Sequence, residues 1–316
     1  MNQICIVLCT YNGEKFLSFF LQSLCNQTEK AKWIVAYDDA STDASVSVLE
    51  KFSEVLPIKI FRGEKNLGHR GAFHQALSFA SQYVDDSDFI ALADQDDEWI
   101  PNKLTLLKKA LVKNPSSALA FGDARVIDAF GKQIAPSWRI YDGIPDRVSI
   151  KAQIAGINHV TGCLSLFRAS LLAKILPIPE GVSVHDRWIA MLAERHGGIY
   201  RLSEAVVKYR LHESNAVGGK PVPPMSQTLK IQENWVLCLL KNAERIPLTE
   251  GEIRFAQKLL KLHQGRQTKG FLPLFLPWIL KNQNELFLPR NLKTRIRQIL
   301  FSLIGLPWAK IFWKKS

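Results

Sequence analysis

Three carboxylates within four positions are the side chains of this chain best suited to chemistry. Asp94, Asp96 and Asp97 directly follow the apolar run 89–93, which has the length and composition of a buried strand. Carboxylates crowded in this way raise one another's pKa unless a cation lies among them. Oxygen ligands in an Asp-x-Asp arrangement suit Mg²⁺ or Mn²⁺, and these ions usually also hold a substrate's phosphates. The motif is short, however, and an acidic first turn of a helix near Pro101 explains it equally well.

Extended and helical patterns alternate along the first hundred residues, and they place the acidic motif on a sheet. Alternation of this kind implies a parallel sheet with helices on its faces, so the predicted fold class is α/β. The expected elements, in chain order, are strand 4–9, helix 14–25, strand 33–37, helix 44–52, strand 58–61, helix 71–84 and strand 89–93.

Polar clusters follow three of these expected strands. They are Thr10 to Asn12, Asp38 with Asp39, and Asp94 to Asp96. Ligands of parallel α/β sheets bind outside the carboxyl ends of the strands. If the sheet is parallel, the three clusters meet on one rim, and this convergence predicts a binding site there.

Four motifs carry a resemblance to a known family. They are Val7 to Gly13 (VLCTYNG), Asp38 to Asp43 (DDASTD), Asn66 to Gly68 (NLG) and Asp94 to Asp97 (DQDD). In this order and at these separations they resemble the inverting family 2 glycosyltransferases, over residues 3 to 217. The DQDD motif, followed by Trp99, Pro101 and Lys103, resembles the rhamnosyltransferase-like branch of bacterial polysaccharide biosynthesis.

The resemblance implies a GT-A fold, which is Rossmann-like with a mostly parallel sheet and flanking helices. It also implies a nucleotide-diphosphate sugar donor and a Mn²⁺ or Mg²⁺ ion. By position, Asp96 and His212 would bind the metal. The residues that would bind the donor are Thr10, Tyr11, Asn12, Glu14, Asp39, Ser41, Asn66, Gly68, Arg70, Asp94, Gln95 and Arg210.

The second half of the match offers a catalytic base and acceptor contacts. Asp186 opens an apolar helical pattern, and in this family an acidic residue at that place is the usual general base. His185, Trp99 and Trp188 are candidates for acceptor binding. Each has a purely structural alternative: Asp186 as a helix cap, His185 as a surface residue, His212 as an ordinary loop residue, and both tryptophans as core.

Glycosyl transfer explains why these residue types are needed. The transition state is cationic at the sugar ring, as it is in glycoside hydrolysis. The leaving diphosphate gains negative charge, which a divalent cation neutralises. Inversion requires the acceptor hydroxyl to attack from the opposite face, and a carboxylate within hydrogen-bond reach takes its proton.

Composition sets outer bounds on the chain. Its 316 residues, 47% of them hydrophobic, suffice for one large or two modest domains. The five cysteines are widely spaced without a paired C-x-x-C pattern, which is typical of reduced cytosolic thiols. No basic segment precedes an apolar stretch at the start, so no signal peptide is expected.

The net charge of +12 lies entirely in the C-terminal third. Residues 1–219 hold 24 basic and 24 acidic side chains, whereas residues 220–316 hold 17 and 5. We therefore predict a catalytic domain over 1–217, a Gly/Pro linker over 218–225 and a basic helical segment over 226–316. Helical patterns in the last segment cover 226–242, 249–265, 274–286 and 292–303.

Two apolar runs in this segment, 271–280 and 299–308, are flanked by basic residues and contain Trp278 and Trp308. Neither has the roughly 18–20 apolar residues that a bilayer span needs. The pattern favours a segment lying on an anionic membrane surface. The alternative is a helical appendage packed on the catalytic domain. Binding to nucleic acid is not expected, because no groove-reading motif is present.

The sequence therefore predicts an inverting hexosyl- or deoxyhexosyltransferase that acts at the inner face of the cell membrane as a peripheral, cytoplasmic enzyme. Its acceptor would be a glycan or a polyprenyl-linked saccharide of an O-antigen, capsule or exopolysaccharide. The alternative is a membrane-associated protein that binds nucleotide sugars on the same fold without transferring them. The carboxylates Asp94, Asp96 and Asp186 favour the enzyme, because a binding protein needs no general base.

Overall fold

The computed structural model describes residues 2–213, 215, 223–288 and 291–312. The chain separates into two compact units. The N-terminal unit comprises Met1–Ile144, Val160–Ile178 and Val184–Lys220, and the C-terminal unit comprises Pro145–His159, Pro179–Ser183 and Pro221–Ser316. The predicted boundaries 1–217, 218–225 and 226–316 stay a prediction, since residues 218–222 lie outside the described part.

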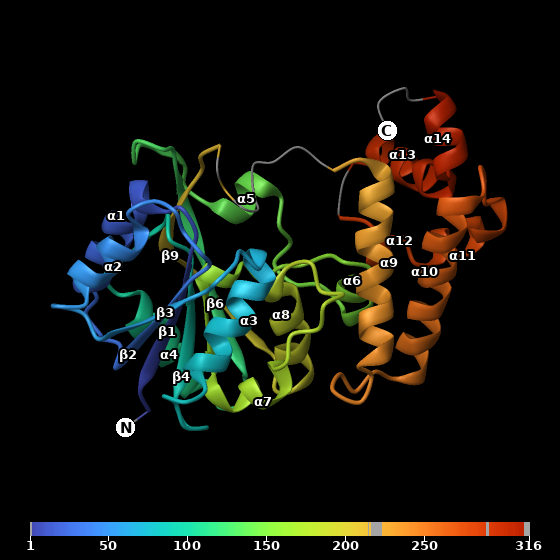
Figure 1. The fold of residues 1–316 in the computed structure, drawn as a ribbon. Coiled ribbons are helices and arrows are strands. Elements are labelled where there is room, and N and C mark those ends of the chain that lie inside the picture. The colour runs from blue at the N-terminus through green and yellow to red at the C-terminus, as the bar shows by residue number, and fades with distance from the viewer. Residues whose placement is uncertain (1, 214, 216–222, 289–290, 313–316) are drawn as a thin grey trace. The chain divides into compact units, whose positions relative to one another are not determined.

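Strands and helices alternate at the start of the N-terminal unit, as the sequence predicts (Figure 1). The first elements are β1 (Ile4–Thr10), α1 (Glu14–Cys25), β2 (Trp33–Asp38), α2 (Ser45–Phe52), β3 (Ile58–Arg62), α3 (Gly68–Ala80) and β4 (Phe89–Ala93). The later elements are β5 (Glu98–Trp99), α4 (Lys103–Lys113), β6 (Leu119–Ile127), β7 (Gln133–Ala135), α5 (Trp138–Asp142), η1 (Gly162–Leu164), β8 (Ser165–Arg168), η2 (Ala169–Leu171), α7 (Leu172–Ile175), α8 (His185–Arg195) and β9 (Ile199–Arg210).

The described strands form one mixed sheet in the order β3-β2-β1-β4-β8-β6-β9-β5, with β7 paired to β6. The first four strands are parallel, as expected. Strand β8 runs antiparallel to both of its neighbours, and β5 runs antiparallel to β9. The α/β class is therefore confirmed, with a mixed second half of the sheet.

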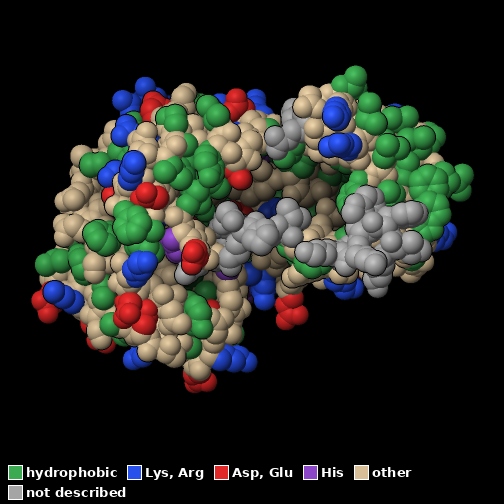
Figure 2. Space-filling view, turned by 90° about the horizontal axis from the view of Figure 1, so that it is seen from above, with side chains coloured by type: hydrophobic (Ala, Val, Ile, Leu, Met, Phe, Trp, Pro, Cys, Tyr) green, Lys and Arg blue, Asp and Glu red, His purple; other side chains and the backbone are tan. Residues whose placement is uncertain are grey.

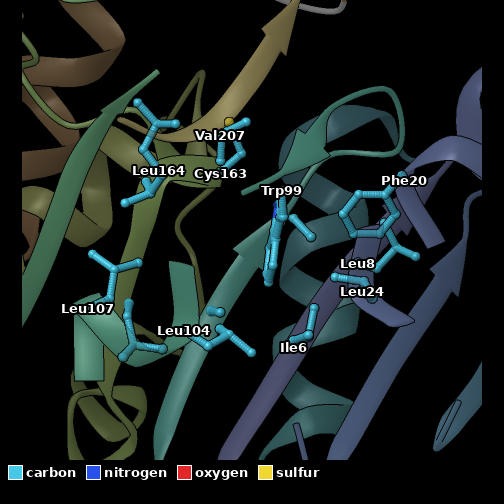
Figure 3. Packing of buried hydrophobic residues seen from close by; sticks show 14 of the residues in the cluster. Ile6, Leu8, Phe20, Leu24, Trp99, Leu104, Leu107, Cys163, Leu164 and Val207 are labelled. Carbon is cyan, nitrogen blue, oxygen red and sulfur yellow. The ribbon is translucent and has the colours of Figure 1, made fainter. Parts of the chain in front are cut away.

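The core lies on the sheet face to which Ile4, Ile6 and Leu8 of β1 point. Helices α1, α2 and α4 supply the other side of this layer, through apolar residues such as Phe20 and Leu104. Figure 3 shows the indole of one tryptophan, Trp99, among these side chains, and its ring meets that of Phe20 edge-on at 5.7 Å. On the opposite face, α3 packs against β1 and β2.

The C-terminal unit is helical in its described residues. Its elements are α6 (Ile150–Ile154), α9 (Met225–Lys241), α10 (Glu250–Thr268), η3 (Pro273–Phe275), α11 (Leu276–Lys281), α12 (Gln283–Leu286), α13 (Leu292–Leu303) and α14 (Leu306–Phe312). Helices α9 and α10 pack against each other, and a capping box formed by Thr249 and Glu252 begins α10. Within the described ranges, no helix combines the length and the hydropathy that crossing a membrane requires.

The single helix expected over 274–286 is three short pieces in the structure. A proline interrupts helix hydrogen bonding except in the first turn, and Pro273 and Pro277 each stand at the first or second position of a separate helix. Asn282 ends α11, and its side-chain amide donates to the Trp278 carbonyl at 2.8 Å. The second apolar run likewise breaks at Ile304, and α14 follows it.

Candidate functional site

A cavity of about 200 Å³ opens at the sheet edge where the neighbouring strands β1, β2 and β4 end. It is the place at which the strand-end clusters were expected to meet. Its lining combines polar groups from these loops with residues of α3 and β9. The lining residues are Cys9, Thr10, Tyr11, Asp39, Asn66, Gly68, His69, Ala72, Phe73, Asp94, Gln95, Asp96, Tyr209 and Asn215.

Hydrogen bonds tie the loop after β1 to the loop after β2. The backbone N–H of Asn12 donates to the Ser41 hydroxyl at 2.9 Å, and the Glu14 carboxylate accepts from the Ala44 N–H at 2.9 Å. Asn12, Glu14 and Ser41, expected to contact the donor, are absent from the described lining of the cavity. They fix the loops that carry the lining residues instead.

Two lining residues of the cavity, Asp39 and Thr10, form hydrogen bonds with different parts of the neighbouring loops. The two oxygens of the Asp39 carboxylate accept from the backbone N–H groups of Leu67 and Gly68, at 2.8 and 2.9 Å. This contact positions the Asn66 loop at the cavity. Thr10 donates to the neighbouring carboxylate of Asp38 at 2.8 Å. Burial raises the pKa of Asp39, and the two backbone donors oppose that rise.

The side-chain amide of Gln95 forms two hydrogen bonds with the backbone of Tyr11. Its side-chain oxygen accepts from the Tyr11 N–H at 2.9 Å, and its amide nitrogen donates to the Tyr11 carbonyl at 3.0 Å. A Cβ on Gly13 would lie 2.1 Å from this oxygen, so a larger residue there would displace the Gln95 amide from Tyr11. Gln95 lines the cavity as expected, and it also holds the loop that presents Tyr11.

The two expected metal ligands meet at one rim of the cavity. Nε2 of His212 lies 2.8 Å from a carboxylate oxygen of Asp96, and Nδ2 of Asn215 lies 3.3 Å from the same oxygen. Residues 96 and 212 are far apart in sequence, and the pairing of β5 with β9 brings their segments together. Asn215, for which the motifs predicted no role, completes this group.

Arg210 is a buried support of the acidic motif, which corrects its assignment to the donor. Its guanidinium donates to the Glu98 carboxylate at 2.6 Å and to the Asp96 carbonyl at 2.9 Å. Its backbone N–H donates to Asp97 at 3.0 Å. With its side chain 3% exposed, this arginine has no surface left for a phosphate.

Beneath the cavity, a buried lysine neighbours the acidic motif. Carboxylate oxygens of Asp94 and Asp97 and the Cys163 sulfur lie within 4.8 Å of one another. Nζ of Lys103 donates to the Cys163 carbonyl at 2.5 Å and lies 3.2 Å from the centre of the Trp99 ring. Burial, followed by the charge of Asp96, raises the pKa of Asp94 to about 7, and burial lowers the pKa of Lys103 to about 7.

This lower group of three is a poor site for Mg²⁺ or Mn²⁺, although its spacing would admit an ion. Burial raises the pKa of the Cys163 thiol well above its usual value, and hard cations prefer oxygen ligands. Lys103 already interacts electrostatically with all three of these groups. The oxygen and imidazole ligands of Asp96 and His212, at the rim, fit such an ion better, with Asp94 as a further acidic lining residue.

Asp186 stands in the first turn of α8 and accepts from the Gly162 N–H at 3.3 Å. Burial raises its pKa, and the nearby His69 partly opposes the rise. His69 lines the cavity and lies with its ring centre 4.6 Å from that of His185, which stacks on Phe73 at 3.7 Å. No motif predicted a role for His69, although it directly follows the Asn66 to Gly68 motif.

Three acceptor candidates are core residues, which corrects their assignment. Trp99, Trp188 and His185 are 3%, 0% and 2% exposed, so none of them can stack on a sugar. Trp188 donates from its indole to the Ile175 carbonyl at 2.9 Å, as a buried Trp usually finds a partner. Arg70 lies outside the described lining and donates to the Ile178 carbonyl at 3.4 Å.

Comparison with known sequences gives a consistent family. The family model described as Glycosyl transferase family 2 matches residues 5–176. The chain is 29% identical over 226 residues to WfgD of Escherichia coli, a UDP-Glc:alpha-D-GlcNAc-diphosphoundecaprenol beta-1,3-glucosyltransferase, covering 69% of this chain and 80% of that protein. It is 25% identical over 224 residues to the dTDP-rhamnosyl transferase RfbG of Shigella flexneri, covering 67% and 73%.

Solved structures share the fold. TarS of S. aureus in complex with UDP-GlcNAc superposes with a TM-score of 0.61 at 18% identity, covering 95% of this chain and 81% of that one. The mannosyltransferase PcManGT of Pyrobaculum calidifontis, in complex with GDP-Man and Mn²⁺, gives 0.53 at 18% identity, covering 99% and 88%. These likenesses confirm the predicted GT-A fold.

Proposed function

Because the chain belongs to glycosyl transferase family 2, we propose that it moves a sugar, with inversion at the anomeric carbon, from a nucleotide-diphosphate donor to a glycan or lipid-linked saccharide. The relatives act in reactions of this kind, one on a diphosphoundecaprenol-linked sugar and one with a dTDP-linked donor. Nucleotide-sugar transfer in bacterial polysaccharide biosynthesis is the part that the family supports directly. The donor sugar and the acceptor are the finer part of the proposal.

The nucleoside end of the donor would lie against the loops after β1 and β2. Thr10, Tyr11, Asp39 and Asn66 present hydroxyl, aromatic, carboxylate and amide groups to one cavity. An aromatic face suits a base, and a carboxylate suits ribose hydroxyls or base N–H groups. Gly68 leaves room beside them, since a Cβ there would meet no atom within 4 Å.

The diphosphate end would lie at the rim formed by Asp96, His212 and Asn215. A Mn²⁺ or Mg²⁺ ion held by Asp96 and His212 would supply charge neutralisation for the departing diphosphate. The side chains of Asp96 and His212 are 15% and 11% exposed, so the pair is accessible to a ligand while partly shielded from water. Arg210 and Glu98 keep the acidic turn in place behind this rim.

Asp186 would accept the proton of the attacking acceptor hydroxyl. A raised pKa makes this carboxylate a stronger base than an exposed aspartate, provided that it stays ionised at the working pH. His69 lines the cavity and is near enough to Asp186 for their charges to interact, and burial lowers the pKa of its imidazole. The bond from oxygen to the anomeric carbon forms as the bond to the diphosphate breaks, and the proton goes to Asp186.

One observation carries the proposal. Three strand-end clusters, predicted separately from the sequence, line one cavity that has Asp96 and His212 at its rim. The test measures the thermal unfolding of the protein in the presence of each of a panel of nucleoside diphosphates, with and without Mn²⁺. Stabilisation by one nucleotide that depends on the metal is expected, with slow hydrolysis of the matching sugar donor. Binding without any hydrolysis or transfer would favour the non-catalytic alternative.

A further inference from the structure

The two apolar runs of the C-terminal unit, which are separate in sequence, are joined in the structure. The N–H of Leu272 donates to the Leu303 carbonyl at 3.0 Å, and the N–H of Gly305 donates to the Gly270 carbonyl at 2.8 Å. Beside this short antiparallel contact, the rings of Phe271 and Trp308 stack with their centres 5.4 Å apart. The runs therefore build one continuous piece of structure.

Large apolar side chains are exposed along this piece. Of the eighteen large hydrophobic residues that are exposed in the described part of the chain, nine lie between residues 271 and 308. Leu274 is 90% exposed and Leu292 75%. Figure 2 shows hydrophobic side chains gathered over the C-terminal unit at the right of the view. Contiguous exposed apolar patches of this kind mark sites that bind another surface.

Helix α13 shows the arrangement in its simplest form. Leu292, Ile296 and Leu300 are exposed at successive turns and form one stripe. Lys293 and Arg297, one position further along, are exposed beside it. Helix α11 packs against α13 and adds the exposed Leu280 and Lys281. We call the exposed apolar residues of 271–308, with these neighbouring cations, the apolar-basic face.

The charge around this face has one sign. Residues 253–316 hold thirteen lysines and arginines and a single acidic residue, Glu285. A second copy that docked through the same face would bring a surface of the same charge against it. A nucleic acid would be attracted by the cations, but its phosphate backbone would not bury the apolar stripe. An anionic bilayer surface complements both features, because its headgroups are negative and its acyl region is apolar.

We propose that the apolar-basic face docks onto the surface of an anionic phospholipid bilayer, with α11 and α13 lying in the plane of the interface. Leu292, Ile296 and Leu300 enter the boundary between headgroups and acyl chains, while Lys293 and Arg297 reach the lipid phosphates. The inference does not rest on the proposed chemistry, since docking needs neither donor nor acceptor. It selects the membrane alternative from the sequence analysis and names the residues that make the contact.

The test is co-sedimentation of the full chain with vesicles of mixed phosphatidylglycerol and phosphatidylcholine, and with phosphatidylcholine alone. The face variant is Leu292→Gln, Ile296→Gln and Leu300→Gln, since glutamine keeps helix propensity. The matched control is Val55→Gln, Val112→Gln and Ile134→Gln, exposed by 71%, 58% and 47% in the N-terminal unit. The face variant is expected to lower partitioning onto mixed vesicles by about tenfold or more, and the control to leave it unchanged.

A second variant keeps the test decisive if the first fails to fold. Lys293→Glu with Arg297→Glu is expected to weaken binding to mixed vesicles, and added salt to weaken binding of the unchanged protein. Equal binding by the face variant and the control, or binding that ignores lipid charge and salt, would overturn the proposal. So would a dimer in sedimentation velocity that the face variant converts to monomer with vesicle binding unchanged. Nucleoside-diphosphate binding, measured on every variant, keeps this result separate from the fate of the proposed enzyme.

Discussion

The two units differ in the kind of side chain that each holds in an unfavourable environment. The N-terminal unit buries ionisable groups, with Asp97 and Lys103 at 1% and 0% exposure beneath one cavity. The C-terminal unit does the opposite, exposing apolar residues such as Leu274 and Leu292. Both arrangements cost stability, because buried polar groups lose hydration and exposed apolar surface orders water.

The difference indicates what each unit binds. A buried network of charges around a cavity suits a small polar ligand, whose position it fixes. An exposed apolar surface with cations suits an extended partner that has charged groups at its surface and an apolar layer beneath them. Chemistry and docking should therefore respond to separate sets of substitutions.

The largest effect is expected for Asp186→Asn. Loss of a positioned proton acceptor should cut sugar transfer by about 10²–10⁴-fold while donor affinity and vesicle binding stay close to those of the unchanged protein. Because burial raises the pKa of Asp186, the unchanged enzyme should lose turnover as the pH falls through a value above that of an ordinary aspartate. Transfer rates and titration calorimetry measure both quantities. Glu54→Gln, at an exposed carboxylate, is the control. Donor affinity that falls as far as turnover would make Asp186 a donor ligand.

The next effect concerns acid stability of the C-terminal unit. Burial lowers the pKa of His263 from 6.5 to about 4, and neither ring nitrogen has a hydrogen-bond partner in the described structure. Between pH 6.5 and 4 the unfolded chain binds a proton that the folded unit refuses, so the free energy of unfolding falls by about 3 kcal/mol. His263→Leu should remove this loss.

Hydrogen exchange of α10 at pH 7 and at pH 4.5 measures the effect. The exchange of β1 and β4 serves as the internal control, because His263 belongs to the other unit. An unchanged acid response of α10 in the variant would show that other groups govern it. A response that spreads equally to the sheet would contradict the independence of the two units.

A smaller effect is expected for Asp96→Asn. The amide is a poorer ligand than the carboxylate, so nucleoside-diphosphate affinity with Mn²⁺ should fall by about 10–100-fold. Affinity in the presence of a chelator should stay the same, as should binding to vesicles. Calorimetric titrations with and without metal measure this, and Asp86→Asn, at an exposed position, is the control. Equal affinity with and without metal in the unchanged protein would reject the metal site.

The smallest effect concerns the backbone of the loop after β2. Ala40 has a φ of 64°, a left-handed conformation that glycine adopts without strain. Ala40→Gly should raise the free energy of unfolding by up to about 1 kcal/mol, part of the gain being offset by chain entropy. Ala110→Gly, inside helix α4, should lower it instead, because glycine has the lower helix propensity. Urea unfolding compares the two, and equal losses in both would contradict the strain.

The early fold was predictable because local patterns determine it. Strand and helix periods fixed β1 to β4, and their parallel pairing follows from the helices between them. The direction of later strands was not predictable, since an apolar run such as 165–168 does not reveal that it lies antiparallel between β4 and β6. The break of the expected helix at 274–286 was readable in principle, because Pro273 and Pro277 stand in it.

The site was predictable at the level of loops and less so at the level of side chains. The strand-end clusters converge, and Asp96 meets His212, because parallel strands share one edge and β5 pairs with β9. The orientation of Arg210 depends on the inner packing of β9, which no motif encodes. Trp99 follows the acidic turn in sequence but points into the core, so nearness in sequence to a motif does not establish contact with a ligand.

The hydrogen bonds between Gln95 and Tyr11 and between Asn12 and Ser41 also bear on the order of events during binding. They hold the proposed nucleoside end of the cavity in place before any ligand arrives, so little conformational entropy would remain to be lost there. At the proposed diphosphate end, Asp96 and His212 contact each other directly and would exchange that contact for the ligand. We expect a donor to dock with its base first, so that recognition of the base precedes and gates the positioning of the sugar.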